Sequence, residues 1–205
     1  MKRKQIFFPV AMTVAGSDSG GGAGIQADLR TFSSLGVFGT SVITALTAQN
    51  PIEVRAVFPV EPSFVTAQLE AVFAKFAVRS LKTGMLLNSA IIRAVSAFLS
   101  GKKNLPVIVD PVMAASSGAM LLKKNAVSDM KNKLFPLADW ITPNIMEAEL
   151  ILGAKIKNFD DALSAAELIH KKWNCGCVLK GGHIEYIKGR KSDIAVFDNR
   201  KYLIS

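Results

Sequence analysis

Short groups of polar residues and glycines stand directly after apolar segments at several points along the sequence. Carboxylates, amides and a lysine in such groups could bind a polar ring, a phosphate or a divalent cation. They can form one site only if the fold brings the ends of these segments together. The groups are the glycine-rich stretch 16–28 with Asp18 and Asp28, then Gln49, Gly84 with Met85, Asp110, Asn144 with Glu147, and Lys180.

The glycine-rich stretch 16–28 follows an apolar run and precedes a helical pattern. A strand that turns through glycines into a helix directs backbone N–H groups and the positive helix end toward one point, which favours an anion. A G-x-G-x-x-A spacing formally fits a dinucleotide-binding fingerprint, but no acidic residue occurs between Asp28 and Glu53 to bind a ribose. The Gly-Lys-Ser/Thr ending of a phosphate loop is also absent. A tight turn that only packs a strand against a helix explains the glycines equally well.

Asn144 and Glu147 are three residues apart at the start of a predicted helix, so both can face the same side. They could hold Mg²⁺ through water molecules, or they could cap the first N–H groups of the helix, which the spacing alone favours. Asp110 ends an apolar segment and either caps a turn or faces a ligand. Lys180 shares this ambiguity, although the two glycines after it favour a phosphate contact. A methionine such as Met85 is more often a core residue, but its thioether also suits the face of a flat ring.

Strand and helix patterns alternate along the sequence, and the strands are mostly apolar without a polar–apolar alternation. This predicts an α/β fold whose mainly parallel central sheet is covered by helices on both faces. Ligands of such sheets bind beyond the carboxyl ends of the strands, where the polar groups stand. The predicted strands are 7–14, 37–48, 54–60, 79–85, 106–110, 140–142 and 177–180, with a hairpin at 193–197 and 201–204, and the predicted helices are 25–35, 62–76, 91–99, 123–135, 145–152 and 161–173.

Length and composition indicate an ordinary globular protein. With 205 residues the chain is long enough for one α/β domain with a sizeable core and short for two. Hydrophobic residues make up 50% and charged residues 20%, which is typical of an ordered protein. The net charge of +9 suits an anionic ligand, but the basic residues occur as scattered pairs without interleaved aromatic residues. We therefore expect no nucleic-acid binding.

Cysteines, histidines and the N-terminal residues suggest no further site. Cys175 and Cys177 are too few for a structural zinc site and too close for an easy disulfide, which indicates small core residues in a reducing compartment. His170 and His183 have no metal-like spacing. Basic residues 2–4 before an apolar run resemble a secretory signal, but a proline interrupts the run and no convincing cleavage site follows. No apolar stretch is long enough to span a membrane, so a cytoplasmic location is expected.

Six stretches together carry a resemblance to a known family. They are AGSDSGGGAGIQAD at 15–28, SVITALTAQN at 41–50, KTGML at 82–86, VDPVM at 109–113, ITPNIME at 141–147 and LKGGH at 179–183. In order and spacing they resemble hydroxymethylpyrimidine/phosphomethylpyrimidine kinases of thiamine biosynthesis, in the ribokinase-like superfamily. The resemblance implies a three-layer α/β/α sandwich that uses ATP and Mg²⁺. It also implies phosphorylation of 4-amino-5-hydroxymethyl-2-methylpyrimidine, and then of its monophosphate to the diphosphate.

The same resemblance implies roles for individual residues. The substrate side would consist of Gly22, Ala23, Asp28, Gln49, Met85 and Val112. Within this set the carboxylate and the amide would recognise polar groups, and the other residues would shape a slot for the ring. Asp110, Asn144 and Lys180 would contact ATP or its phosphates, and Glu147 would organise Mg²⁺. The expected partners are a small pyrimidine and a nucleotide, and members of this family commonly form homodimers.

One part of the family pattern has no counterpart in this sequence. The family carries a later Gly-Thr-Gly-Cys-type turn that supplies the catalytic base and an anion hole, and residues 1–205 contain no such turn. The base and the anion hole are therefore expected beyond Ser205, and no catalytic residue is identified within the sequence. We expect a single kinase domain, 1–205, without its C-terminal anion-hole segment and with apolar surface left uncovered. The alternatives are pyridoxal or pyridoxine kinase activity, a catalytically inactive pyrimidine-binding module, and a folded remnant without a ligand.

Overall fold

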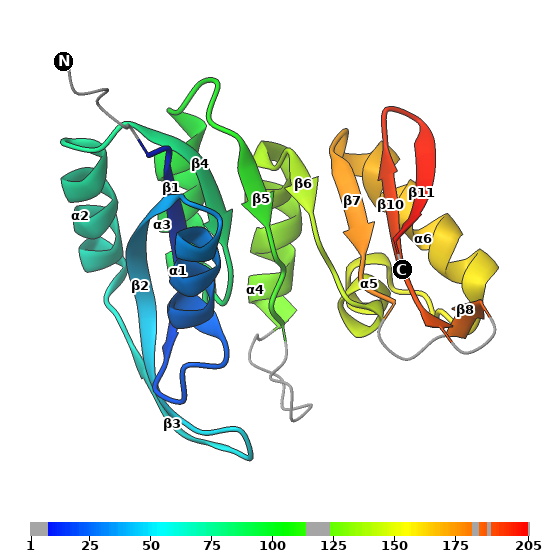
Figure 1. The fold of residues 1–205 in the computed structure, drawn as a ribbon, viewed down its shortest axis with the longest axis horizontal. Helices are drawn as coiled ribbons and strands as arrows, with labels where there is room; N and C mark the ends of the chain where they lie inside the picture. Colours follow the sequence, from blue (N-terminus) through cyan, green and yellow to red (C-terminus); the bar gives the residue numbers. More distant parts are fainter. Residues whose placement is uncertain (1–7, 114–123, 182–184, 188–189, 205) are drawn as a thin grey trace, which may run out of the picture.

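The computed structural model describes residues 8–113, 124–181, 185–187 and 190–204. The strands are β1 (Val10–Asp18), β2 (Phe38–Gln49), β3 (Val54–Pro59), β4 (Val78–Thr83), β5 (Val107–Val109), β6 (Trp140–Ile141), β7 (Gly176–Leu179), β8 (Glu185–Ile187), β9 (Arg190–Lys191), β10 (Asp193–Phe197) and β11 (Arg200–Ile204). The helices are α1 (Gly24–Ser34), α2 (Pro62–Phe73), α3 (Ser89–Ser100), α4 (Lys124–Asp129), α5 (Ile145–Leu152) and α6 (Phe159–Trp173). Among the described residues, the strands form a nine-stranded sheet in the order β11-β10-β7-β6-β5-β4-β1-β2-β3 (Figure 1) and a separate two-stranded sheet of β8 and β9.

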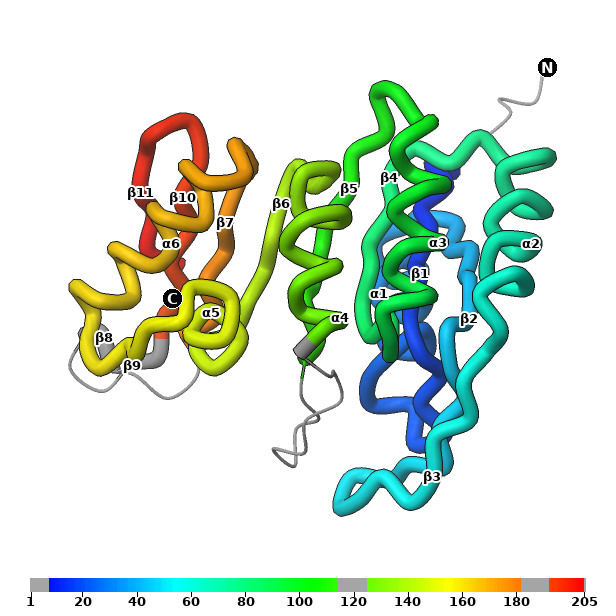
Figure 2. Tube along the Cα trace, turned by 180° about the vertical axis from the view of Figure 1, so that it is seen from behind, coloured from blue at the N-terminus to red at the C-terminus, as the bar shows by residue number. Residues whose placement is uncertain are grey.

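The centre of the sheet is parallel and its edges are antiparallel. Strands β2, β1, β4, β5, β6 and β7 pair in the same direction. Strands β3, β10 and β11 each pair antiparallel with a neighbour at the two edges. Helix α1 packs on one face against β1 and β2, and Figure 2 shows α2, α3, α4 and α6 on the other face. The predicted α/β fold, with a mainly parallel sheet and helices on both faces, is confirmed.

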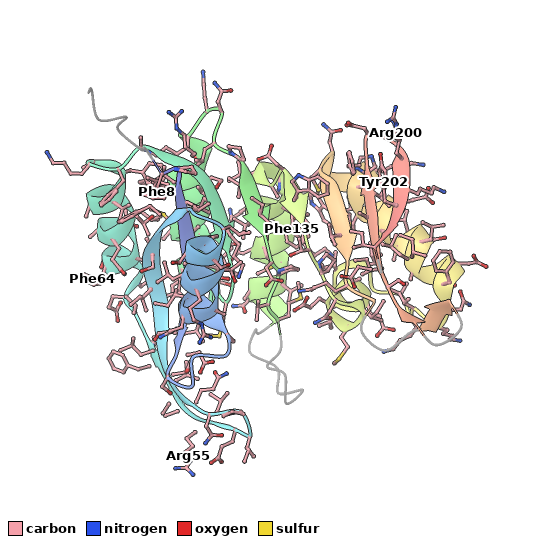
Figure 3. The ribbon with its side chains drawn as sticks, viewed as in Figure 1. Phe8, Arg55, Phe64, Phe135, Arg200 and Tyr202 are labelled. Carbon is pink, nitrogen blue, oxygen red and sulfur yellow. The ribbon has the colours of Figure 1, made fainter. Side chains whose placement is uncertain are left out.

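The core lies between the sheet and its helices. Residues 11–15 of β1 are all buried, because this strand has neighbours on both sides and helices on both faces. This explains why the strand is apolar without alternation. Phe135, labelled in Figure 3, is fully buried. Its ring meets that of Trp173 edge-on, with 4.9 Å between the ring centroids. Burying one such large side chain stabilises the fold by about 1.5–3 kcal/mol.

The first strand is longer at its carboxyl end than the predicted strand 7–14. It begins at Val10 and extends to Asp18, so part of the glycine-rich stretch belongs to the strand. A register shift between Ala15 and Ser17 allows β1 to continue its pairing with β2 up to Asp18. The turn itself is therefore short and covers residues 19–23.

The helix predicted over 123–135 is another correction. It is α-helical only over Lys124–Asp129, and residue 123 lies outside the described residues. The chain continues as a π-helical turn, Met130–Leu134, and a 3₁₀ turn that contains Pro136. Proline lacks the N–H group that a regular α-helix would need at this position, which is consistent with the change in winding. The short hairpin β8–β9 has no counterpart in the prediction, since strands of three and two residues leave no periodic pattern.

The predicted hairpin near the C-terminal end is confirmed as β10 and β11, joined by Asp198 and Asn199. Both turn residues have positive φ, 49° and 57°, which matches the twist of a two-residue hairpin. On the sheet face opposite α6, the ring of Phe197 stacks on Tyr202 at 4.8 Å and lies 5.3 Å from Trp140. Among the described residues, no helix lies in front of β7, β10 and β11 in Figure 1, and Tyr202 is 39% exposed.

The beginning of α1 yields a test of how closely the helix approaches β1. Gly24 has a φ of +56°, and a Cβ there would lie 2.3 Å from the carbonyl oxygen of Gly16. We expect Gly24→Ala to lower the free energy of unfolding by about 2–4 kcal/mol, because a backbone clash adds to an unfavourable φ. Gly36→Ala is the matched control, since Gly36 has a φ of +70° with no atom within 4 Å of a Cβ. It should cost only about 1 kcal/mol. Urea unfolding measures both, and equal costs would mean that the close approach does not matter.

Candidate functional site

A pocket of about 560 Å³ opens beyond the carboxyl ends of the parallel strands. Its walls are the turn after β1, the hairpin between β2 and β3, and the residues that follow β4, β5, β6 and β7. The carboxyl ends of these strands lie at the lower edge of the sheet in Figure 1. The structure brings together every residue that the sequence predicts for ligand binding, although their individual roles stay predictions. The pocket is lined by Gly22, Ala23, Asp28, Gln49, Met85, Asp110, Val112, Asn144, Glu147 and Lys180, among others.

The expectation for the catalytic base and the anion hole stays a prediction. Ser205 itself falls outside the described residues, and the last described residue is Ile204 at the end of β11. The structure therefore does not test this part of the prediction. Within the described residues, the pocket wall consists of groups that can bind ligands, and we assign none of them the role of the base.

The carboxylate of Asp18 organises the glycine turn. Its Oδ1 accepts a hydrogen bond from the N–H of Gly20, and its Oδ2 accepts hydrogen bonds from the N–H groups of Gly22 and Ala23, each at 2.8 Å. The side chain of Gln26 holds the strand end, because its Oε1 accepts from the N–H of Asp18 at 2.9 Å. These donors are therefore occupied by the chain's own carboxylate and are not free for a phosphate. Of the two interpretations of the glycines, the structure favours the tight turn.

Asp28 lies on α1 and accepts hydrogen bonds from side chains of two neighbouring strands. The hydroxyl of Thr13 in β1 donates to Asp28 Oδ2 at 2.6 Å. The ammonium of Lys82 in β4 donates to both oxygens of Asp28 at 3.1 Å. Thr13 and Lys82 are direct partners in the parallel register, so one carboxylate can reach both. Asp28 is thus a partly buried, paired carboxylate that faces the pocket.

Asp110 and Lys180 meet at the other end of the pocket. Asp110 follows β5 and Lys180 follows β7, and the Lys180 ammonium lies 2.8 Å from Asp110 Oδ1. Lys82 also lies 3.6 Å from the other oxygen of Asp110. Lys180 forms an isolated parallel bridge with Asn144, and its N–H donates to the carbonyl of Pro143 at 2.8 Å. The strand ends therefore fix both charged residues in the pocket wall.

Asn144 and Glu147 form a capping box at the start of α5. Asn144 Oδ1 accepts from the N–H of Glu147, and Glu147 Oε2 accepts from the N–H of Asn144, each at 2.8 Å. Glu147 is only 3% exposed, and its other oxygen lies 3.4 Å from the N–H of Met113. Burial raises the pKa of the Glu147 carboxyl, while the Asn144 N–H and the charge of Lys180 oppose this shift. The capping interpretation is confirmed as geometry, and the metal role of Glu147 stays a prediction.

The remaining predicted residues shape the wall near the glycine turn. Met85 extends over Gly16, where a Cβ would lie 2.4 Å from the methionine methyl carbon. The hydroxyl of Thr44 donates to the Met85 carbonyl at 2.6 Å and so fixes this backbone. Gln49 ends β2, and its N–H donates to the hydroxyl oxygen of Ser19 at 2.8 Å. Val112 also lines the pocket, and its N–H donates to the carbonyl of Asp110 at 2.9 Å.

Sequence reasoning misses two contributions to the pocket. Lys82 belongs to one of the family motifs without a role of its own, yet it bridges Asp28 and Asp110. The available signal is a lysine between the apolar Leu81 and the buried Thr83 in a central strand, where a charge needs partners. The connection between β2 and β3, for which the sequence analysis gives no role, also contributes Ile52 and neighbouring residues to the pocket lining.

The cysteines and His170 lie outside this site. Cys175 and Cys177 are buried free thiols, and burial raises the pKa of both, that of Cys175 to about 11. His170 Nδ1 lies 2.7 Å from the carbonyl oxygen of Cys175, and His183 falls outside the described residues. Within the described part of the chain, no group of three or more histidines, cysteines and acids could hold a metal ion by itself. No helix among the described residues is long and apolar enough to span a membrane.

Comparison with solved structures identifies the class of protein. A phosphomethylpyrimidine kinase from Clostridium difficile 630 matches with a TM-score of 0.87 and 43% identity, covering 96% of this chain and 84% of that chain. An ADP complex of Bacillus subtilis pyridoxal kinase matches with a TM-score of 0.87 and 32% identity, covering 97% of this chain and 75% of that chain. The fold is that of the ribokinase-like vitamin kinases.

Sequence comparison identifies the family within this class. The family model for phosphomethylpyrimidine kinase matches residues 18–205. The hydroxymethylpyrimidine/phosphomethylpyrimidine kinase of Haemophilus influenzae is 51% identical over 172 residues, or 84% of this chain. The chain spans 64% of that relative's length. The chain belongs to the phosphomethylpyrimidine kinase family.

Glu147 offers a test of the site's electrostatics through pH. A folded state with a raised carboxyl pKa binds a proton more readily than the unfolded chain, so stability falls as pH rises above the ordinary value of 4.5. Glu147→Gln cannot ionise. We therefore expect the wild type to lose free energy of unfolding relative to this variant between about pH 4 and pH 7. Urea unfolding across this range, without Mg²⁺ or nucleotide, measures the difference.

Glu149→Gln is the matched control for this experiment. The pKa of Glu149 is lowered by the N–H of Ile156 and by Lys155, so its contribution is present at neutral pH and is lost as pH falls. The difference between the wild type and Glu149→Gln should therefore change with pH in the opposite direction. The same direction for both variants would contradict the assignment of a burial penalty to Glu147.

Proposed function

We propose that this chain is the core of a kinase that transfers phosphate from ATP to hydroxymethylpyrimidine and then to its monophosphate. The observation that carries the proposal is the pocket, whose two ends differ in chemistry. One end offers Asp28 and Gln49 beside glycines and apolar side chains, and the other offers Lys180, Asp110 and Glu147. This division suits a small polar ring at one end and phosphate groups at the other. Membership of the phosphomethylpyrimidine kinase family supports the same activity.

The ring would lie between the glycine turn and Met85. Gly22 and Ala23 would leave space for the ring, because they carry little or no side chain and their N–H groups donate to Asp18. An aminopyrimidine offers a donor next to ring-nitrogen acceptors. A carboxylate such as Asp28 only accepts, whereas the amide of Gln49 can donate and accept. Together the two residues can read both kinds of group, and Val112 would complete the slot.

The phosphates would lie at the end formed by Lys180, Asp110 and Asn144. A lysine ammonium offsets phosphate charge, and its pairing with Asp110 holds it in the pocket wall before any ligand arrives. Mg²⁺ fits this donor set only in part, because it would need phosphate oxygens and water beside the carboxylates of Glu147 and Asp110. Mg²⁺ commonly uses one or two carboxylates in this way, and when bound it would neutralise charge on the transferred group.

The acceptor hydroxyl also needs a base and an anion hole, and we assign neither to a residue of this chain. The family resemblance implies that both come from a glycine-rich turn that follows the matched motifs. The residues described here would bind, orient and enclose the ligands, which in phosphoryl transfer is a large part of catalysis. We therefore assign to this chain the binding of both ligands, with transfer depending on that turn.

Pyridoxal kinase activity is the second candidate. The match to Bacillus subtilis pyridoxal kinase reaches the same TM-score, 0.87, as the match to the phosphomethylpyrimidine kinase of Clostridium difficile. Pyridoxal also carries a hydroxymethyl group on a flat nitrogen ring, so the same slot could accept it. The higher identity to the phosphomethylpyrimidine kinase, 43% against 32%, favours the pyrimidine.

We further propose that the chain forms one domain and acts in the cytoplasm. The continuous sheet from β3 to β11 and its shared core support a single domain. Two buried free thiols suit a reducing compartment, where ATP is also available. Recovery of the native protein in a membrane or secreted fraction would contradict this location.

Calorimetric titration tests the proposed function on this chain. We expect one site for hydroxymethylpyrimidine and one for AMP-PNP with Mg²⁺. Gln49→Ala should weaken pyrimidine binding about 5- to 30-fold, the effect of one or two lost hydrogen bonds, and leave nucleotide binding unchanged. Lys157→Ala, at an exposed residue outside the pocket lining, is the control and should bind like the wild type. Tighter binding of pyridoxal than of the pyrimidine would favour the second candidate, and the absence of binding of all ligands would rule out both.

A homodimer through the β3 edge is also proposed. Strand β3 is an exposed edge strand, and Phe58 and its cross-strand partner Leu46 are 70% and 47% exposed. Figure 3 shows Phe64 on the outer side of α2, and it is 61% exposed. Apolar side chains on an open edge favour pairing with another chain. Phe58→Asp should convert a dimer into a monomer by light scattering, whereas Phe8→Asp, at a residue 59% exposed elsewhere, should not. A monomeric wild type would refute the proposal.

A further inference from the structure

Four side chains of alternating charge form a continuous row along the pocket. Asp28 lies 3.1 Å from Lys82, Lys82 lies 3.6 Å from Asp110, and Asp110 lies 2.8 Å from Lys180. The row links the end assigned to the pyrimidine with the end assigned to the phosphates. All four side chains line the pocket and are partly buried, so their interactions are less screened than those of surface pairs.

Lys82 occupies the middle of this row and has room to move. Its strand, β4, lies between β1 and β5, and its register partners are Thr13 and Ile108. A Cβ on Gly84 would come within 3.2 Å of the Lys82 ammonium, so the glycine keeps the space beside the ammonium open. Among the described residues, Lys82 is the lysine or arginine that forms an ion pair with Asp28.

Each of the two carboxylates in the row has a different nearest lysine. Lys82 is closer to Asp28 than to Asp110, whereas Asp110 has Lys180 as its nearer cation. Lys180 is the more exposed lysine, with 40% of its side chain accessible against 24% for Lys82. An anionic ligand can therefore attract Lys180 away from Asp110. Asp110 would then keep only Lys82 as a partner within the row.

We propose that Lys82 is a positioning residue that couples the two ends of the pocket. When a polyphosphate engages Lys180, Lys82 shifts toward Asp110 and its bonds to Asp28 lengthen. The Asp28 oxygens then become better acceptors for a hydrogen-bond donor on the ring. The phosphate ligand thereby tightens ring binding, and by linkage the ring tightens phosphate binding by the same factor. This inference rests on the proposed function, since it assigns the ring to Asp28 and the phosphates to Lys180.

The test is a set of calorimetric titrations at constant ionic strength. Hydroxymethylpyrimidine is titrated into the full chain with and without saturating AMP-PNP and Mg²⁺, and the nucleotide analogue is titrated with and without the pyrimidine. In the wild type, we expect each ligand to lower the Kd of the other about 5- to 30-fold, within the usual range for coupled sites. Reciprocal factors that agree would support a linked equilibrium.

The variants separate coupling from simple loss of binding. Lys82→Met should bind each ligand but show a ratio of affinities near one, and Lys82→Arg should restore part of the coupling. Lys155→Met is the control, because Lys155 is also ion-paired, with Glu149 of α5, but lies outside the pocket lining. This variant should retain full coupling. If Lys82→Met does not fold, Asp110→Asn replaces it, because loss of this carboxylate interrupts the row and should also abolish coupling.

Each outcome has a distinct meaning. Binding of both ligands to the wild type without mutual effect would overturn the role of Lys82 and leave the proposed function intact. Undiminished coupling in Lys82→Met, or in Asp110→Asn where that variant is used, would overturn it as well. Binding of neither ligand to the wild type would overturn the proposed function and the coupling together.

Discussion

The parallel pairing of β1, β4, β5, β6 and β7 is the constraint on which the site depends. Because these strands run in one direction, their carboxyl ends meet at one edge of the sheet, and the residues after them share one pocket. Side chains that are far apart in the sequence thereby come within hydrogen-bond distance. Asp110 and Lys180 are separated by 70 positions, and the ammonium of one lies 2.8 Å from a carboxylate oxygen of the other. A single charge in this row would be costly to bury, but alternating charges compensate one another.

The N–H groups of a glycine turn can either bind an anionic ligand or bond to a side chain of the same chain. Free N–H groups after a strand attract anions, but here Asp18 accepts hydrogen bonds from three of them. The internal carboxylate fills the place that a phosphate would take. The N–H groups of the turn are hydrogen-bonded and its side chains are small, so a flat and largely apolar ring face could pack against it. This favours the phosphate-binding role for Lys180 and Asp110 at the opposite end of the pocket.

Much of the fold could be predicted from the sequence, because parallel strands leave apolar runs. Polar residues at the strand ends indicate where the pocket lies, whereas the roles of individual pocket residues come from the family resemblance and stay predictions. The failures have physical causes. The continuation of β1 to Asp18 depends on a bulge that only the pairing with β2 reveals. The π-helical turn before Pro136 depends on packing that a helical pattern does not record. The role of Lys82 escapes the sequence because it comes from two partners, Asp28 and Asp110, that lie 54 and 28 positions away.

Structural and functional interpretations of Asn144 and Glu147 need not compete. The capping box holds the Glu147 carboxylate through hydrogen bonds to backbone N–H groups, and burial at the same time disfavours its charged form. A carboxylate in this state gains more than an exposed one from a nearby cation, because the cation compensates the missing hydration. In the proposed metal role, the hydrogen bonds that begin α5 would also orient the Glu147 carboxylate toward a divalent ion bound with phosphates. A cap of this kind fixes the position of the group in advance, which lowers the cost of organising the ligands when they bind.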